Sequence, residues 1–288
     1  MYHASNPTFA ADLLSHAIDL YQWGTEKETT KYSNYYRSAT ASIYPSSDAQ
    51  DDLAWAAYWL YRATGNRTYL QSSVNYYRKK SWDVTIDWDN SGAAVAVALA
   101  NLAADGVSVP YASDITNFVV KNFLQQWMTP SGEIRRTPNG MHYPKWSRWG
   151  NAQLSTTAAF AAAVHAKHTQ SNTLRQSAVQ FARDQLDYVM GGTDSGFSFI
   201  VGFGSKYPLR PHHAGASCPS DRSIKCDWSD FDRPDPNPMI LYGALVGGPE
   251  GPGDNSYNDK RSDYVSNEVA SDYNSGLTGA LAGVVQFL

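Results

Sequence analysis

The chain has 288 residues and a formal net charge of -4, which argues against a nucleic-acid-binding surface. No apolar run approaches the length of a membrane span, and the segment Met1–Pro7 lacks the basic and apolar regions of a signal peptide. Aromatic residues make up 13% of the chain, a share that suits sugar stacking and equally suits a helical core.

Apolar residues that recur every three or four positions predict a succession of helices along the chain. The first helix is expected to begin after Asn6, a capping residue that precedes a proline. The segment Ala93–Ala104 is small and apolar all round, which predicts a buried helix. A short helix is expected over Met239–Val246. The other predicted helices span Ser47–Thr64, Tyr69–Lys79, Ile115–Met128, Ala152–His168 and Leu174–Met190.

The segment Thr193–Pro236 is rich in Gly, Pro, Ser and Asp and is predicted to form loops. Long loops within a compact domain are usually functional. There is little strand alternation, no short repeat and no break in composition along the chain. These features indicate one all-α domain over residues 1–288.

A final helix is predicted around Glu268, with Asn267 as its N-cap and Glu268 in its first turn. A carboxyl group at the start of a helix and surrounded by tyrosines can be shielded from water. Desolvation raises its pKa and favours a general acid near neutral pH. The alternative is that Glu268 only complements the helix dipole. The predicted buried face of this helix consists of Val269, Tyr273, Leu277, Leu281, Val284 and Leu288.

The stretch around Glu268 resembles the C-terminal active-site signature of family 9 glycoside hydrolases, the inverting cellulases. The resemblance implies that Glu268 is the proton donor, that Asp259 is its partner acid and that Tyr273 contacts substrate. Several spaced positions agree at once, which makes the match specific. The matching residues are Tyr257, Asp259, Tyr264, Glu268, Ala270, Asn274 and Ser275.

The segment Ser198–Ala214 resembles the second signature of the family, in which His212 falls on the active-site histidine. His213 is expected to bind substrate beside it, because adjacent histidines on a Pro-rich loop can donate hydrogen bonds to sugar hydroxyls. A metal site is disfavoured, since no third ligand lies nearby. The family has an arginine two residues after this histidine, but Ala214 stands there and removes a planar, multi-donor group.

Trp149 resembles a family tryptophan that stacks on glucose, and its alternative role is a half-buried core ring. The polar residues that follow it in the family are replaced here by Gln153 and Leu154. Trp88 is also expected to contact substrate.

An acidic cluster resembles the calcium site of some family members, since hard oxygen ligands at this density suit calcium. The alternative is a helix N-cap followed by acidic first-turn residues, with no metal. No other cofactor is expected to be required for the chemistry. The expected calcium ligands are Ser47, Asp48, Asp51, Asp52 and Asp89.

The two cysteines, Cys218 and Cys226, are eight positions apart and are expected either to bridge, as in a secreted protein, or to remain free thiols. The sequence Asn66-Arg-Thr is a glycosylation sequon, which also favours a secreted, extracellular location.

The resemblance covers almost the whole chain and implies an α/α toroid, a barrel of paired helices, with hydrolysis of internal β-1,4-glucan bonds by inversion. Family members carry their catalytic base in an Asp-x-Gly-Asp motif, which this sequence lacks. We therefore expect the C-terminal two-thirds of a family 9 catalytic domain, a toroid incomplete on its N-terminal side and lacking a preceding segment. The alternative function is a catalytically inactive glucan-binding protein. No nucleic-acid or membrane partner is expected.

Overall fold

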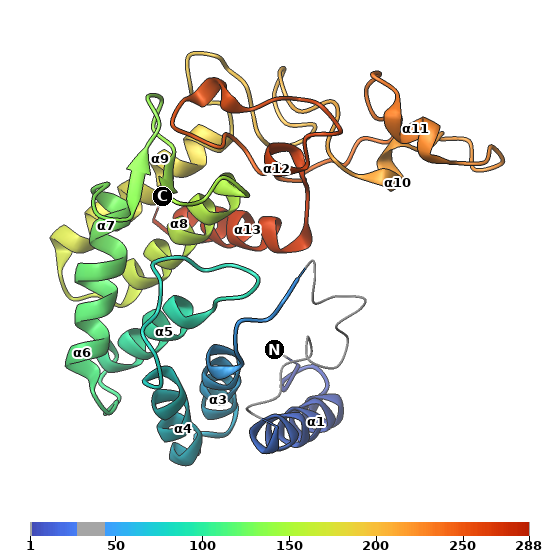
Figure 1. Cartoon of the computed structure of the whole chain (residues 1–288). Coiled ribbons are helices and arrows are strands. Elements are labelled where there is room, and N and C mark those ends of the chain that lie inside the picture. Colours follow the sequence, from blue (N-terminus) through green and yellow to red (C-terminus); the bar gives the residue numbers. More distant parts are fainter. Residues whose placement is uncertain (1, 28–43, 288) are drawn as a thin grey trace. The chain divides into compact units, whose positions relative to one another are not determined.

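A computed structural model of the chain describes residues 2–27 and 44–287, which are mostly helical (Figure 1). The chain divides into two compact units, Met1–Val119 and Val120–Leu288, each considered by itself below. None of the helices in the described ranges is both long enough and apolar enough to cross a bilayer.

The N-terminal unit is built around α3, which packs against α1, α4 and α5. The side chain of Asn6 accepts the backbone N–H of Phe9 at 3.1 Å, so it caps α1 as expected. α5 is buried almost all round, as its apolar composition predicts. The helices of this unit are α1 (Pro7–Glu26), α3 (Gln50–Thr64), α4 (Arg67–Tyr77), α5 (Gly92–Ala104) and α6 (Ala112–Asn117).

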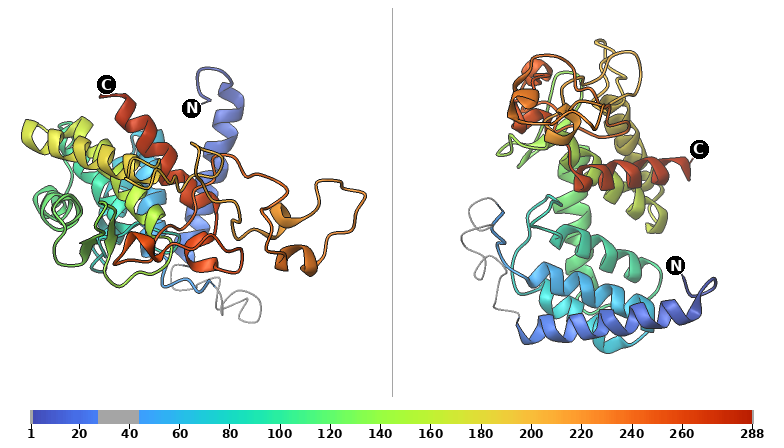
Figure 2. Two further views of the ribbon diagram at one scale, coloured as in Figure 1. Left: turned by 90° about the horizontal axis from the view of Figure 1, so that it is seen from above. Right: turned by 90° about the vertical axis from the view of Figure 1, so that its right-hand side faces the viewer.

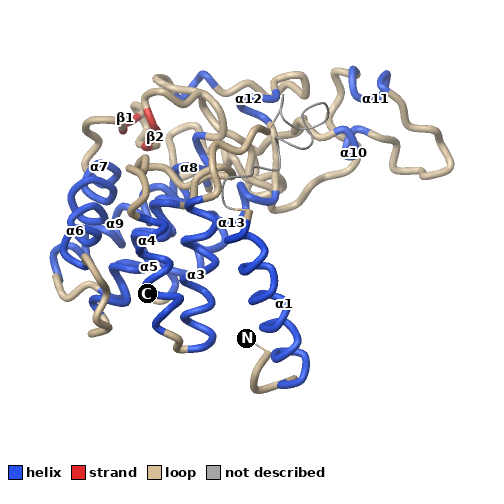
Figure 3. Tube along the Cα trace, turned by 60° about the horizontal axis from the view of Figure 1, so that its bottom comes forward, coloured by secondary structure: helices blue, strands red, loops and turns tan. Residues whose placement is uncertain are grey.

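A helical segment continues from α6 through a π-helical stretch, η1 (Phe118–Leu124), into α7 (Gln125–Met128). It therefore covers the predicted helix Ile115–Met128. In the C-terminal unit a short hairpin of β1 (Ile134–Arg136) and β2 (His142–Pro144) follows, drawn in red in Figure 3. This hairpin is too short to leave a clear alternating pattern in the sequence.

The core of the C-terminal unit is α8 (Asn151–His168), which packs between α9 (Asn172–Val189) and α13 (Ser271–Val285) (Figure 1). α13 approaches α8 closely because it carries glycines on the facing side. A Cβ atom at Gly276 would lie 2.2 Å from the Thr157 hydroxyl oxygen, so a larger residue does not fit there. The remaining elements are α10 (Ala214–Ser217), α11 (Trp228–Asp232), η2 (Asp254–Ser256) and α12 (Tyr264–Asn267).

The helix predicted over Met239–Val246 is wrong, because this segment is extended and turned. Gly243 has a φ of +83°, which breaks a right-handed helix. Leu245 and Val246 instead form isolated β-bridges with residues distant in sequence, Ile200 and Val269 respectively. Long-range pairing therefore overrides the local apolar pattern.

The predicted position of Glu268 in a first helical turn is also wrong. Asp263, not Asn267, caps a single turn, α12, by accepting the backbone N–H of Ser266 at 3.2 Å. Glu268 follows that turn with extended backbone angles, φ -64° and ψ 146°, and α13 begins only at Ser271. The face predicted for this helix does lie inward, since Tyr273, Leu277 and Val284 are buried and Leu281 is half-buried; Leu288 lies outside the described residues.

Candidate active site

The backbone at Glu268 is held from both sides by segments distant in sequence. On one side, His212 donates its backbone N–H to the Asn267 carbonyl at 2.8 Å. On the other side, Gly247 donates its backbone N–H to the Glu268 carbonyl at 3.1 Å. The two family signatures, which contain Glu268 and His212, therefore meet as neighbouring extended segments.

The carboxyl group of Glu268 is half-buried and receives two hydrogen bonds on one oxygen. Trp149 donates its indole N–H to Oε2 at 2.8 Å, and Tyr273 donates its hydroxyl to the same atom at 3.3 Å. Burial, followed by the negative charge of Glu268, raises the pKa of Tyr273, so its hydroxyl keeps its proton and remains a donor. Within the described ranges, no hydrogen-bond partner contacts Oε1. This second oxygen can therefore exchange a proton with a bound ligand.

Trp149 is 46% exposed, so about half of its ring is accessible, and its expected stacking on sugar stays a prediction. Its position depends on Gly150, which begins α8 with a φ of +66°. A Cβ atom at Gly150 would lie 3.0 Å from the Tyr273 hydroxyl, in left-handed backbone that strains other residues. Gln153 and Leu154, which follow on α8, are buried.

The ring of His212 has a defined proton position. Its Nδ1 atom lies 2.7 Å from the backbone carbonyl of Arg261, which can only accept a hydrogen bond. Nδ1 therefore carries the proton, and Nε2 is left to interact with a ligand. His213 instead caps α10, because its Nδ1 accepts the backbone N–H of Ala216 at 3.0 Å. Ala214, which stands at the family's arginine position, is exposed at the start of α10.

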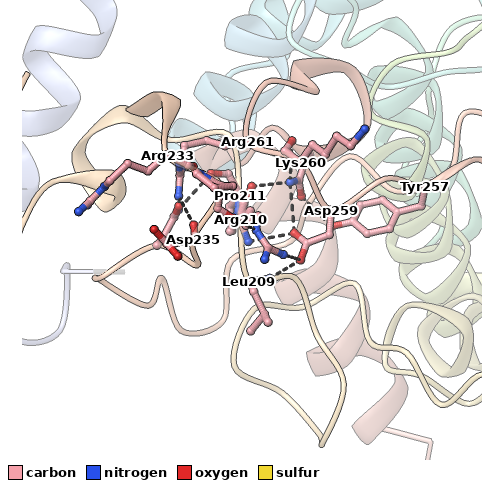
Figure 4. Close-up of polar contacts among 12 residues, drawn as sticks. Leu209, Arg210, Pro211, Arg233, Asp235, Tyr257, Asp259, Lys260 and Arg261 are labelled. Carbon is pink, nitrogen blue, oxygen red and sulfur yellow. Dashed lines mark hydrogen bonds and ion pairs between the residues drawn. The ribbon is translucent and has the colours of Figure 1, made fainter. Parts of the chain in front are cut away.

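Asp259 faces the loop that leads to His212 (Figure 4). Its Oδ2 accepts the backbone N–H of Leu209 at 3.0 Å, and its Oδ1 accepts that of Arg210 at 2.9 Å. The guanidinium group of Arg210 also lies 3.5 Å from Oδ2. Both oxygens of Asp259 are thus used to hold residues directly before His212, an arrangement suited to positioning.

Two further residues that the sequence did not single out for such a role hold the site together. Asn267 is fully buried; its amide donates to the Arg210 carbonyl at 2.5 Å, and its Oδ1 accepts the Tyr257 hydroxyl at 2.6 Å. Arg261 is only 4% exposed and donates to backbone carbonyls that include those of Phe231 and Arg233, each at 2.6 Å. Burial of a charged arginine is rare unless it is paired in this way.

Trp88 belongs to the N-terminal unit, where it is 53% exposed and makes an edge contact with Tyr44 at 5.4 Å between ring centroids. Its expected contact with substrate stays a prediction. In the C-terminal unit, Cys218 and Cys226 form a disulfide with a Cα–Cα distance of 5.2 Å. The bridge closes the loop between α10 and α11.

The expected calcium ligands also lie in the N-terminal unit, and most of them already have partners. The backbone N–H of Ser47 contacts both carboxylate oxygens of Asp89, at 2.9 and 3.2 Å. Asp51 accepts the backbone N–H of Ser91 at 2.7 Å, and Asp48 forms an ion pair with a lysine.

These carboxylates are close enough to affect one another. Desolvation, followed by repulsion from Asp51, Asp89 and Asp48, raises the pKa of Asp52 to about 6. Such a concentration of oxygen donors suits calcium. Across the described part of the chain, however, no three acidic, His or Cys side chains converge in a metal-binding arrangement. The calcium site therefore stays a prediction.

Three aromatic residues surround His212 and Trp149 or contact those that do. The ring centroid of Tyr264 lies 5.2 Å from that of Trp149 and 5.9 Å from that of His212. Phe231 also contacts His212, at 5.5 Å, and Trp228 contacts Phe231 at 5.8 Å. Trp228 and Phe231 lie in the segment predicted as loops, where a spacing of three residues was the only signal for a short helix.

Comparison with known proteins gives matches to a family model, to curated endoglucanases and to solved structures. The family model for Glycosyl hydrolase family 9 matches residues 1–281. The chain is 34% identical to Endoglucanase 5 of Arabidopsis thaliana over 304 residues, a match covering 96% of this chain and 47% of that protein. It is 36% identical to an endoglucanase of Dictyostelium discoideum over 291 residues, covering 99% of this chain and 37% of that protein. The chain thus spans less than half the length of these two relatives.

Solved structures of endoglucanases also match the chain. An endoglucanase from the termite Nasutitermes takasagoensis matches with a TM-score of 0.84 and 37% identity, covering 99% of this chain and 61% of that one. Endoglucanase CelQ from Clostridium thermocellum, complexed with cellobiose and cellotriose, matches with a TM-score of 0.76 and 34% identity, covering 93% and 43%. The endoglucanases of this family have an α/α barrel fold, which confirms the predicted fold class.

Proposed function

Because this chain belongs to glycosyl hydrolase family 9, we propose that it hydrolyses internal β-1,4-glucosidic bonds of cellulose-type glucans with inversion. The observation that carries the proposal is the carboxyl group of Glu268, held by Trp149 and Tyr273 beside exposed aromatic rings. The endoglucanase relatives support a β-glucan substrate, as does the neighbour complexed with cellobiose and cellotriose.

In this proposal Glu268 is the general acid. Its Oε2 receives hydrogen bonds from Trp149 and Tyr273, so the proton of the neutral acid resides on Oε1. From there it passes to the glycosidic oxygen as the bond to the leaving sugar breaks. The exposed face of Trp149 packs against the sugar ring, and His212 Nε2 accepts a hydrogen bond from a sugar hydroxyl.

Inversion also needs a second carboxylate, roughly 6.5–9.5 Å from the first, to activate water on the opposite face of the sugar. Asp259 is a poor candidate, because both of its oxygens hold backbone N–H groups ahead of His212. We assign Asp259 to positioning the His212 loop and leave the water-activating role to another carboxylate.

Glu268→Gln tests the assignment, because glutamine keeps the shape of the side chain but cannot donate the proton. General acid catalysis contributes about 100-fold to 10,000-fold, so the release of reducing ends from carboxymethylcellulose should fall by that factor. Glu133→Gln is the matched control, because the Glu133 carboxylate lies at the surface in an ion pair with Lys145 at 2.9 Å. Equal activity in wild type and Glu268→Gln would disprove the role of Glu268.

A secreted, extracellular location belongs to the same proposal. It is supported by the disulfide between Cys218 and Cys226, because disulfides persist mainly in oxidising compartments. Asn66, the glycosylation sequon, is exposed at the start of α4. Peptide mapping of the native protein under non-reducing conditions tests both features. Free thiols together with an unmodified Asn66 would count against secretion.

A further inference from the structure

An unbroken row of aromatic rings leads away from Glu268. It starts at Trp149, whose indole N–H contacts the Glu268 carboxylate. It continues through Tyr264, His212 and Phe231, with centroid separations between 5.2 and 5.9 Å, and ends at Trp228. The row therefore links the Glu268 carboxyl group, through successive ring contacts, to Trp228, which itself contacts neither Glu268 nor His212 in the ring contacts among the described residues.

Trp228, at the end of this row, is 73% exposed. Its ring contact with Phe231 has an interplanar angle of 80°, an edge contact, and its high exposure leaves most of the indole accessible. In Figure 1 and in the left-hand view of Figure 2, the segment containing α10 and α11 extends away from α8, α9 and α13. Tryptophan is enriched at binding interfaces, because its ring combines a large apolar surface with a polar N–H group.

The segment that carries Trp228 is firmly held despite this exposure. The Asp227 carboxylate accepts the backbone N–H of Ser229 at 2.9 Å, and the Asp230 carboxylate accepts the backbone N–H of Asp227 at 3.0 Å. The two residues thus form a reciprocal capping box at the start of α11. The disulfide at Cys226 lies directly before this cap. The buried Arg261 donates hydrogen bonds to the Phe231 carbonyl within α11 and to the carbonyls of Arg233 and Asp235 after it. The fold thus fixes the position of an exposed indole.

Polar groups lie next to the row as well. Phe231 lines a cavity of about 570 Å³ whose other walls include Asp232, Arg233 and Lys260. Carboxylate, guanidinium and ammonium groups supply both acceptors and donors for hydroxyl groups. A flat apolar surface beside such groups matches the two kinds of surface of a pyranose ring, its C–H face and its hydroxyl edge.

We propose that Trp228 is an outlying sugar-stacking site that binds a glucosyl unit of the same β-glucan chain whose bond lies at Glu268. The inference rests on the proposed glucanase function and adds that the affinity for an oligosaccharide depends on its length. Oligosaccharides long enough to span from Glu268 to Trp228 gain one stacking contact, and shorter ones do not.

The test is calorimetric titration with cellotriose and cellohexaose, in a Glu268→Gln background that keeps the sugars intact. Trp228→Ala should weaken cellohexaose binding about 3-fold to 10-fold, the effect of one aromatic contact, and leave cellotriose binding unchanged. Trp228→Tyr keeps a ring and should retain most of the affinity. Ile224→Ala is the matched control, because it removes an exposed apolar side chain, 56% exposed, from the disulfide-closed loop that precedes α11 without removing a ring.

The outcomes separate the two proposals. Unchanged cellohexaose binding in Trp228→Ala, or an equal loss in Ile224→Ala, would overturn the outlying site while cellotriose binding still supports the glucanase. Equal weakening of both sugars by Trp228→Ala would also overturn it, because the effect would not depend on length. A parent protein that binds neither sugar would refute the glucanase function itself.

Discussion

Trp149 donates its indole N–H to Oε2 of Glu268 at 2.8 Å, across 119 residues of sequence. A resemblance assigned Trp149 to sugar stacking, whereas this contact makes it a positioning residue for the acid as well. Tyr273 reinforces the contact from the first turn of α13. The two roles use different parts of the indole, its N–H edge and its faces, so they can be separated by mutation.

Trp149→Phe keeps a stacking face and removes the hydrogen bond. A hydrogen bond to a charged group is worth about 1.5–3 kcal/mol, so we expect kcat to fall roughly 10-fold to 150-fold. KM should change little, because stacking persists. Trp149→Ala should lower kcat and also raise KM. Steady-state kinetics on cello-oligosaccharides measure both constants, and a Phe variant that changes only KM would contradict the positioning role.

Asp259→Ala separates positioning from direct catalysis. Two backbone N–H groups, those of Leu209 and Arg210, lose their acceptor, so the free energy of unfolding should fall by about 1–3 kcal/mol. Activity should fall because the His212 loop shifts, and added azide should not restore it. Denaturant titration and assays with azide give the two readouts. Recovery of activity with azide would instead identify Asp259 as the water-activating base.

Asp52 makes stability depend on pH. Its pKa is about 6 in the folded chain and near 3.8 when unfolded, so its charged form is disfavoured by folding. The loss of folding stability caused by ionising Asp52 is absent below pH 3.8, grows as the pH rises and is complete above pH 6. Asp52→Asn should therefore stabilise the calcium-free protein at pH 7 but not at pH 3.5. Asp52 is exposed, and screening limits the gain to below about 1 kcal/mol.

In the presence of calcium, Asp52 should stabilise the protein instead of destabilising it. If the cluster around Asp52 binds the ion, calcium at pH 7 should raise the melting temperature of the wild type and have a much smaller effect on Asp52→Asn. Thermal melts with calcium and with a chelator measure both effects. Equal melting temperatures of the wild type in the two conditions would remove the calcium site.

Gly247→Ala should disturb the site through the backbone. A Cβ atom there would lie 2.7 Å from the Val265 carbonyl oxygen, which belongs to the main chain and cannot move aside easily. The segment that pairs with Glu268 would shift, so we expect a destabilisation of about 1–3 kcal/mol and a loss of activity. Gly204→Ala is the control, because it introduces strain at a φ of +76° with no atom nearby. Similar activity loss in both variants would contradict this account.

The helical class, most helix positions and the identity of the main candidates follow from the sequence alone. Helical periodicity and capping are local, so α1 begins where expected and α5, α8 and α9 lie within a few residues of their predicted bounds. The spacing of residues around Glu268 and His212 likewise sufficed for the family resemblance. The disulfide could be anticipated as one of two outcomes because its cysteines are only eight residues apart.

Only the tertiary structure decided the conformation and environment of Glu268. Its backbone is extended because it pairs with segments near His212 and Gly247. Local sequence propensity does not predict such long-range pairing. Asp259 is committed to backbone N–H groups about 50 residues away, and Trp149 reaches Glu268 from another helix start. Each of these contacts satisfies a polar group or orders a ring through long-range packing. Local patterns specify the elements, whereas the site arises where distant elements meet.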